Sequence, residues 1–268
     1  MKRLTGIPLT GLAAIVVLSV TTAPVMAQAL AAKASADMPH KLADGKPDLN
    51  GIWEAMNTAS WDIQDHNGQW GVPPGLGVVE GNEIPYQPWA LEKKKQNFAN
   101  RETEDLTESK CYMPGVPRIT YMPYPFQITQ TPEAIAFSYE FDHVLRVIHM
   151  QGEHPDPNTF IDTWMGDSRG HWEGDTLVVD LRNFNDQTWF DKAGNFHSDA
   201  LHVVERYSLA DAGHMNYEVT IEDPKVFTKP WKMSMPLYRR MEKDARLLEY
   251  ECVFYLQEKM YKNAPFKK

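Results

Sequence analysis

Short runs of alternating apolar and polar residues dominate the second half of the chain. Residues 126–130, 135–139 and 143–150 follow the two-residue period of strands that bury one face. In the third run, one face carries Val144, Arg146, Ile148 and Met150. These runs predict three short, consecutive β-strands.

Further hairpins are predicted where turn residues separate two such runs. The strongest turn is Gly174-Asp175. Three strand pairs are predicted: 169–173 with 176–181, 201–209 with 215–222, and 231–238 with 247–256. Successive hairpins are typical of an up-and-down meander, and closure of such a sheet removes its exposed edges. We therefore predict an all-β, mainly antiparallel fold, a lipocalin-like barrel or half-open barrel, with a β-sandwich as the alternative.

The first half of the chain has a different texture. Residues 49–131 are rich in proline, glycine and tryptophan, which favours loops that wrap a scaffold. Residues 89–100 are the exception, because Pro88 is placed to open a short helix. We predict a single domain over 49–268, with a loop-rich wrapping segment at 49–131 and a meander at 132–258.

The N-terminus has the pattern of an export signal. Lys2 and Arg3 precede an apolar run at 12–20 that is too short to span a membrane. Cleavage is expected after Ala27, with Ala29 as the second choice, and 28–48 is expected to be a flexible leader. This predicts a periplasmic or secreted protein that is not inserted in a membrane after cleavage; an uncleaved anchor is the alternative.

The net charge limits the classes of binding partner, and the two cysteines bear on the cellular compartment. The net charge of −9 becomes −11 when the two positive charges of Lys2 and Arg3 are removed. Nucleic acids and anionic membranes are therefore poor partners. In an oxidising compartment Cys111 and Cys252 are expected to pair, which would contribute ~4–5 kcal/mol in the chain-entropy model. Two buried free thiols are the alternative.

Several longer stretches resemble a family of exported bacterial proteins. The similarity includes DGKPDLNGIW at 44–53, WMGDSRG at 164–170, WEGDTLVVD at 172–180 and HVVER at 202–206. The resemblance covers most of the mature chain and implies no particular reaction. After Glu249-Tyr250 the family has Cys-His-Glu-Gly-Asn, whereas this chain has Cys252-Val253-Phe254-Tyr255. The cysteine is the matching feature there.

No strong catalytic motif is present in the sequence. It has no glycine-rich phosphate loop, no Gly-x-Ser-x-Gly, no His-Glu-x-x-His and no Cys-x-x-Cys. A site built from His149, His154, His197 or His202 with an aspartate would lack the usual ligand spacing. We therefore expect chemistry that needs neither a metal nor a cofactor.

The loop at 183–198 is one candidate for acid–base chemistry. It joins two predicted strands and contains Asp191 and His197. Imidazole exchanges protons near neutral pH, and a carboxylate from Asp191 or Asp199 would fix its tautomer. The alternative is a polar turn that His197 merely caps.

The next strand supplies a second candidate. His202 and Arg206 share one face, and Glu205 lies on the other among apolar residues. If that apolar face points inward, desolvation would suit Glu205 to general acid–base work. The alternative is a structural ion pair between Glu205 and Arg169 or Arg146.

These candidates lead to a functional hypothesis. We expect a periplasmic enzyme that holds a small, partly apolar molecule in a barrel cup and performs acid–base chemistry of the lyase, hydratase or isomerase type. The candidate catalytic residues are His197, Glu205, Asp191, Arg169 and His202. The candidate binding residues are Trp189, Trp172, Trp231 and Tyr217, although large aromatic residues most often fill a core. A noncatalytic ligand-binding protein of the cell envelope is the alternative.

Overall fold

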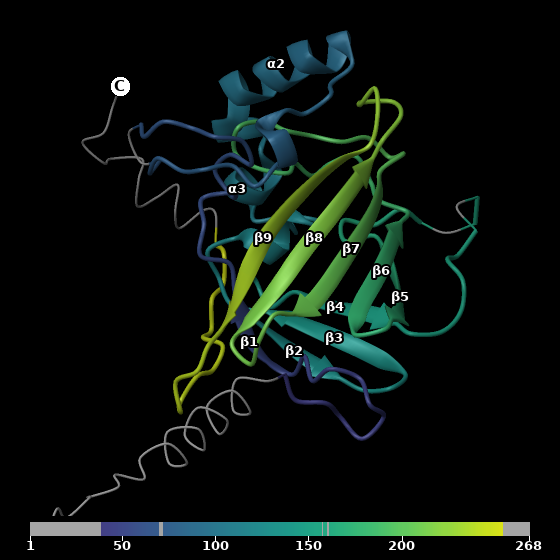
Figure 1. The fold of residues 1–268 in the computed structure, drawn as a ribbon. Helices are drawn as coiled ribbons and strands as arrows, with labels where there is room; N and C mark the ends of the chain where they lie inside the picture. The colour runs from purple at the N-terminus through teal and green to yellow at the C-terminus, as the bar shows by residue number, and fades with distance from the viewer. Residues whose placement is uncertain (1–38, 70–71, 157, 160, 254–268) are drawn as a thin grey trace, which may run out of the picture. The chain divides into compact units, whose positions relative to one another are not determined.

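The computed structural model describes residues 39–69, 72–156, 158–159 and 161–253, all within one compact unit. In this part of the chain nine strands form a closed barrel (Figure 1). The strands are β1 (Gly51–Glu54), β2 (Phe126–Gln130), β3 (Ala134–Tyr139), β4 (Leu145–His149), β5 (Asp167–Glu173), β6 (Thr176–Arg182), β7 (His202–Leu209), β8 (His214–Glu222) and β9 (Trp231–Arg239). The prediction of a lipocalin-like β-barrel is confirmed.

The strands follow one another around the barrel in chain order. Neighbours pair antiparallel except β4 and β5, which are parallel. The segment between β4 and β5 is long enough for a crossover, so the chain enters β5 in the direction of β4. The predicted hairpins β5–β6 and β7–β8 are confirmed.

The third predicted hairpin is wrong. Strand β9 pairs with β8 on one side and with β1 on the other. Because β1 occupies the edge that residues 247–256 would need, the described residues 247–253 form no strand. Strand β1 comes from the segment predicted only to wrap the scaffold.

The barrel lumen is filled with side chains. Strand β7 alternates as expected, so that Val203, Glu205 and Tyr207 point inward and are buried. Aromatic rings from other strands stack beside them, with Tyr207 and Tyr217 at 4.9 Å between ring centroids and Phe126 and Phe137 at 5.6 Å. The inside of the barrel is therefore a packed core.

Short helices accompany the barrel. They are η1 (Glu80–Asn82), α2 (Pro88–Glu104), α3 (Leu106–Lys110) and α4 (Arg118–Tyr121). Figure 1 shows α2 and α3 near one end of the barrel. The helix predicted at 89–100 is confirmed as α2, which starts at Pro88 and continues to Glu104. Asn97 attaches α2 to the β6–β7 connection by donating to the carbonyl of Gly194 over 3.2 Å.

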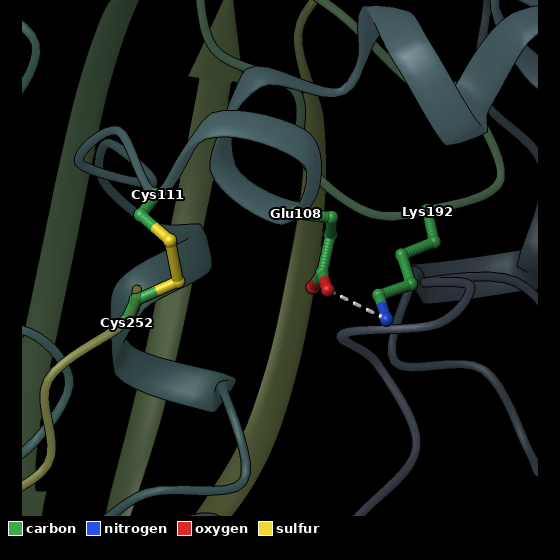
Figure 2. The surroundings of a disulfide bond; sticks show 4 residues. All are labelled: Glu108, Cys111, Lys192 and Cys252. Atoms are coloured by element: carbon green, nitrogen blue, oxygen red, sulfur yellow. Dashed lines mark ion pairs between the residues drawn. A yellow bond between two sulfur atoms is a disulfide. The ribbon is translucent and has the colours of Figure 1, made fainter. Parts of the chain in front are cut away.

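The predicted bond between Cys111 and Cys252 is confirmed (Figure 2). Cys111 ends α3 in the left-handed conformation, and Cys252 lies near the end of the described chain. Their Cα atoms are 5.4 Å apart and 141 residues separate them in sequence. The disulfide therefore ties α3 to the C-terminal segment.

Part of the predicted leader is structured. Residues 39–48 make a tight turn around Gly45, whose φ is +79°. Lys41 pairs with Asp175 at 2.7 Å, and the Lys46 ammonium lies 5.7 Å from the centre of the Trp172 ring. These contacts fasten the turn to the barrel. The predicted signal peptide, 1–27, lies outside the described residues, within which no helix is long and apolar enough to cross a membrane.

Candidate functional site

A hollow of about 400 Å³ lies between residues 61–69 and Val72, helices α2 and α3, and the β6–β7 connection. We call it the Asp62 pocket. Its lining is formed by Trp61, Asp62, His66, Gln69, Val72, Phe98, Arg101, Glu102, Asp105, Glu108, Lys192 and Ala193. Most of these side chains are polar or charged, and Trp61 and Phe98 supply two aromatic surfaces among them.

The aromatic walls carry cations that are themselves paired. The Lys192 ammonium lies 4.0 Å from the centre of the Trp61 ring and 2.8 Å from a carboxylate oxygen of Glu108 (Figure 2). The Arg101 guanidinium lies 4.3 Å from the centre of the Phe98 ring and 3.6 Å from Glu102. Both cations therefore have a π face and a carboxylate as neighbours.

A buried ion pair holds the floor of the pocket. Arg118 of α4 donates two hydrogen bonds to Asp105, at 2.9 and 2.8 Å, and both side chains are almost completely buried. Although burial opposes the charge, Asp105 raises the pKa of Arg118 above its ordinary value. Asp105 separates α2 from α3, so this bidentate pair fixes the angle at which α3 leaves α2.

Two carboxyl groups meet behind the pocket wall. Asp62 lines the pocket, and its Oδ1 accepts the backbone N–H of Gln64 at 2.9 Å. Asp191 lies behind it, fully buried, and accepts the backbone N–H of Ile63 at 2.9 Å and two bonds from Asn195 at 3.1 and 2.6 Å. Burial, and then the charge of Asp62, raise the pKa of Asp191 to about 7. Burial also raises the pKa of Asp62, so both carboxyl groups hold their protons to a higher pH than exposed aspartates do.

His66 follows on the same loop. Its Nδ1 lies 2.9 Å from the carbonyl oxygen of Gln64. Because a carbonyl only accepts, Nδ1 carries the proton, and Nε2 of the neutral ring has a free lone pair. This Nε2 is shielded from solvent and has no hydrogen-bond partner within the described chain. The same loop thus carries a carboxyl group and an imidazole.

Local hydrogen bonds give this loop its shape. The backbone N–H of Asp65 donates to the Asn82 side chain at 2.7 Å, and Asp65 accepts the N–H of Gly77 at 2.6 Å. A Cβ on Gly77 would come within 2.6 Å of the Gln64 backbone, so only glycine allows this approach. The loop at 61–66 is therefore held by the segment at 75–82 that lies against it.

The structure places Asp191 and His197 in different surroundings. His197 is buried, its Nδ1 donates to the Ser198 carbonyl at 2.9 Å, and its Nε2 accepts the Thr188 hydroxyl at 2.6 Å. Burial lowers its pKa, which favours the neutral ring. No carboxylate contacts this imidazole within the described residues, and Asp199 pairs with Lys225 instead. The acid–base pair expected at His197 is therefore not formed.

Glu205 lies in the barrel lumen. It accepts a bond from Arg146 at 2.5 Å and bonds from the hydroxyls of Tyr217 and Tyr207 at 2.5 and 3.1 Å. Arg146 also donates to Ser168 at 3.0 Å. The inward position expected from the sequence is observed, and the partner is Arg146 of β4 rather than Arg169.

Arg169 lines an open groove of about 740 Å³, and it is linked to His202 through Asp167, His154 and Asp180. His154 has both ring nitrogens 2.7 Å from carboxylates, one of Asp167 and one of Asp180. His202 also approaches Asp180 at 2.7 Å, which raises the pKa of His202, and Arg169 pairs with Asp167. Each charged side chain of this network pairs with another one. The network therefore fastens residues 150–156 to the barrel and leaves few unpaired groups that could act on a substrate.

The four candidate binding residues lie away from the Asp62 pocket. Tyr217 is in the lumen, and Trp231 packs against Phe190 and Phe227 in the core. Trp172 contacts the N-terminal turn, and Trp189 lines a separate hollow of about 360 Å³ beside α2. None of them lines the Asp62 pocket.

Sequence reasoning missed Asp62 and His66. They are not in an alternating run, and the composition of their loop predicts only a wrapping segment. The available signal was the presence of a carboxylate and an imidazole beside Trp61 in an otherwise proline- and glycine-rich stretch.

Within the described residues, no group of three or more histidine, cysteine, aspartate or glutamate side chains is placed to hold a metal ion. No protein-family model, curated protein or solved structure matches this chain.

Proposed function

We propose that the Asp62 pocket binds a small, partly apolar molecule and transfers protons to and from it. The observation that carries the proposal is the Asp62–Asp191 pair: a carboxyl group in the lining of a pocket that also holds Trp61 and Phe98, with a second carboxyl group whose pKa is raised to about 7 by burial and by the charge of Asp62. Perturbed carboxyl groups in a concave site are typical of general acids and bases.

The geometry suggests a division of roles. Asp62 faces the ligand and exchanges the proton, while Asp191 lies behind it and sets how many protons the pair holds. His66, on the same loop, has a lone pair free for a second proton once the loop adjusts to a ligand. An acid and a base on one wall suit elimination, hydration or isomerisation. We therefore propose cofactor-independent chemistry of the lyase, hydratase or isomerase type.

We also propose that the protein works in the periplasm or outside the cell. The Cys111–Cys252 disulfide supports an oxidising compartment. The export signal expected at 1–27 and the acidic net charge are consistent with this location.

A noncatalytic binding protein is the second candidate. The observation that favours it is that His66 Nε2 is shielded from solvent. Asp62 is then the one proton-transfer group, of these two, that lies directly in the pocket wall. The two candidates share the pocket and differ only in turnover.

Native mass spectrometry of the periplasmically expressed protein, followed by incubation of the released ligand with fresh protein in D₂O, tests the proposal. We expect the ligand to be converted or to gain deuterium. Asp62→Asn should slow this exchange by ~10²–10⁴-fold, which is typical for loss of a general acid or base. Glu83→Gln, at an exposed carboxylate outside the pocket, is the charge-matched control. A ligand that binds but neither reacts nor exchanges would show a binding protein.

A further inference from the structure

We infer that the ligand of the Asp62 pocket is a protonated amine that carries a flat apolar group. This inference rests on the proposed use of that pocket and adds the chemical class of its ligand. It follows from the charges that the pocket walls leave unpaired and from the direction of their free hydrogen-bonding groups.

Asp62 is the carboxylate of this pocket that lacks a cation. Glu108 is paired with Lys192, Glu102 with Arg101, and Asp105 with the buried Arg118. Within the described residues no lysine, arginine or histidine lies within ion-pair distance of Asp62, and the nearby Lys94 donates to Gln64 over 3.4 Å instead. Because a partly buried charge is costly without a partner, a ligand cation is its natural complement.

Two acceptor atoms near the pocket wall, on Asp62 and His66, have no hydrogen-bond donor within the described residues. Asp62 uses Oδ1 for the Gln64 backbone and leaves Oδ2 available, and His66 Nε2 has a lone pair. Because His66 Nε2 is shielded from solvent, Asp62 is the acceptor that a ligand in the pocket meets, and a ligand that satisfies it must donate a hydrogen bond. An ammonium group has three donors and a positive charge, so it fits beside Asp62, whereas a ligand carboxylate would be repelled by the Asp62 carboxylate.

The rest of the wall favours an aromatic or flat apolar body. Trp61 and Phe98 line the pocket, and both rings already have a cation within 4.5 Å of their centres, which shows that cations are accommodated at these faces. An anionic ligand would compete with Glu108 and Glu102 for Lys192 and Arg101. A cationic ligand leaves those pairs intact.

Isothermal titration calorimetry with three probes of similar shape tests the inference: 2-phenylethylamine, 2-phenylethanol and 3-phenylpropanoate. We expect the amine to bind at least about tenfold more tightly than the alcohol, equivalent to ~1.4 kcal/mol, and the carboxylate to bind most weakly. Amine affinity should increase with pH as Asp62 loses its proton, since only the ionised carboxyl attracts the ammonium. The neighbouring titratable groups Asp191, Lys94 and His66 shift the midpoint without changing this sign.

Variants locate the effect. Asp62→Asn should reduce amine affinity at least about tenfold, weaken its dependence on pH and leave alcohol affinity unchanged, while Glu83→Gln should behave as wild type. Thermal melts of each variant show whether it is folded. Equal affinity for amine and alcohol, tighter binding of the carboxylate, no binding of any probe at millimolar concentration, or an Asp62→Asn variant that binds the amine normally would each overturn the inference.

The outcome separates this inference from the proposed function. If amines bind through Asp62 but the copurified ligand neither reacts nor exchanges protons, the amine assignment holds and the enzymatic proposal fails. If the ligand reacts and Asp62→Asn abolishes the reaction, but amines bind no better than alcohols, the enzymatic proposal holds and the amine assignment fails.

Discussion

Replacing Glu205 with glutamine should destabilise the barrel because it leaves Arg146 without its counter-ion. Glu205 is fully buried and binds Arg146, Tyr207 and Tyr217. The glutamine carbonyl can still accept from the two tyrosines, which leaves the amide N–H groups against the Arg146 guanidinium. Breaking one partner of a buried ion pair costs ~3–5 kcal/mol. For a chain of this size that corresponds to a fall in melting temperature on the order of 10 °C.

Urea and thermal unfolding of Glu205→Gln measure this effect. Glu218→Gln on β8 is the matched control, because Glu218 is an exposed carboxylate next to Tyr217 and the change should cost less than ~0.5 kcal/mol. In an Arg146→Met background Glu205→Gln should cost much less than it does alone, since no guanidinium is then stranded. A loss below ~1 kcal/mol for the single change, or costs that simply add, would refute the buried-pair account.

Three further predictions follow from other parts of the structure. Cys111→Ala with Cys252→Ala should lower the free energy of unfolding by ~4–5 kcal/mol, because the disulfide closes a loop of more than a hundred residues; an unchanged urea midpoint would contradict this. The pKa of Asp191 is raised in the folded state, so its stabilising contribution is complete below about pH 4 and is lost as the pH rises through about 7. The free energy of unfolding of the wild type should therefore fall over this pH range more steeply than that of Asp191→Asn. Parallel pH profiles for the two proteins would exclude this role of Asp191. His154→Gln should speed amide hydrogen exchange in residues 150–156, because His154 links that segment to Asp167 and Asp180. His171→Gln, at an exposed histidine, should leave this exchange unchanged. Equal exchange rates in the two variants would contradict the role of His154 in fastening the segment.

The barrel could be predicted where its signals are local. The Gly174-Asp175 turn and the alternation of β7 are contained in a few residues each, so the hairpins and the inward position of Glu205 followed from the sequence. The identity of its partner did not, because the choice of Arg146 depends on closure of the barrel. Strand β1 was missed because it has only four residues in a stretch without alternation. The parallel pairing of β4 with β5 could not be predicted either, because it depends on where the long connection between these two strands returns to the sheet.

The candidate site was less predictable for a physical reason. Burial by packed loops raises the pKa of Asp62, and Asp191, which accepts the N–H of the neighbouring Ile63, is 128 residues away from Ile63 in sequence. Asp191 was singled out, but with His197, which the structure pairs with Thr188 and Ser198. Long-range packing of loops has no periodic signal. The disulfide was predictable because only two cysteines are present.

The most direct test of the account is a crystal structure of the protein soaked with 2-phenylethylamine. The account predicts the ammonium nitrogen at hydrogen-bond distance, about 2.7–3.0 Å, from the Asp62 carboxylate, with the ring beside Trp61 and Phe98. Ligand density in the barrel lumen near Glu205, or in the groove beside His154, with the Asp62 pocket empty, would contradict it.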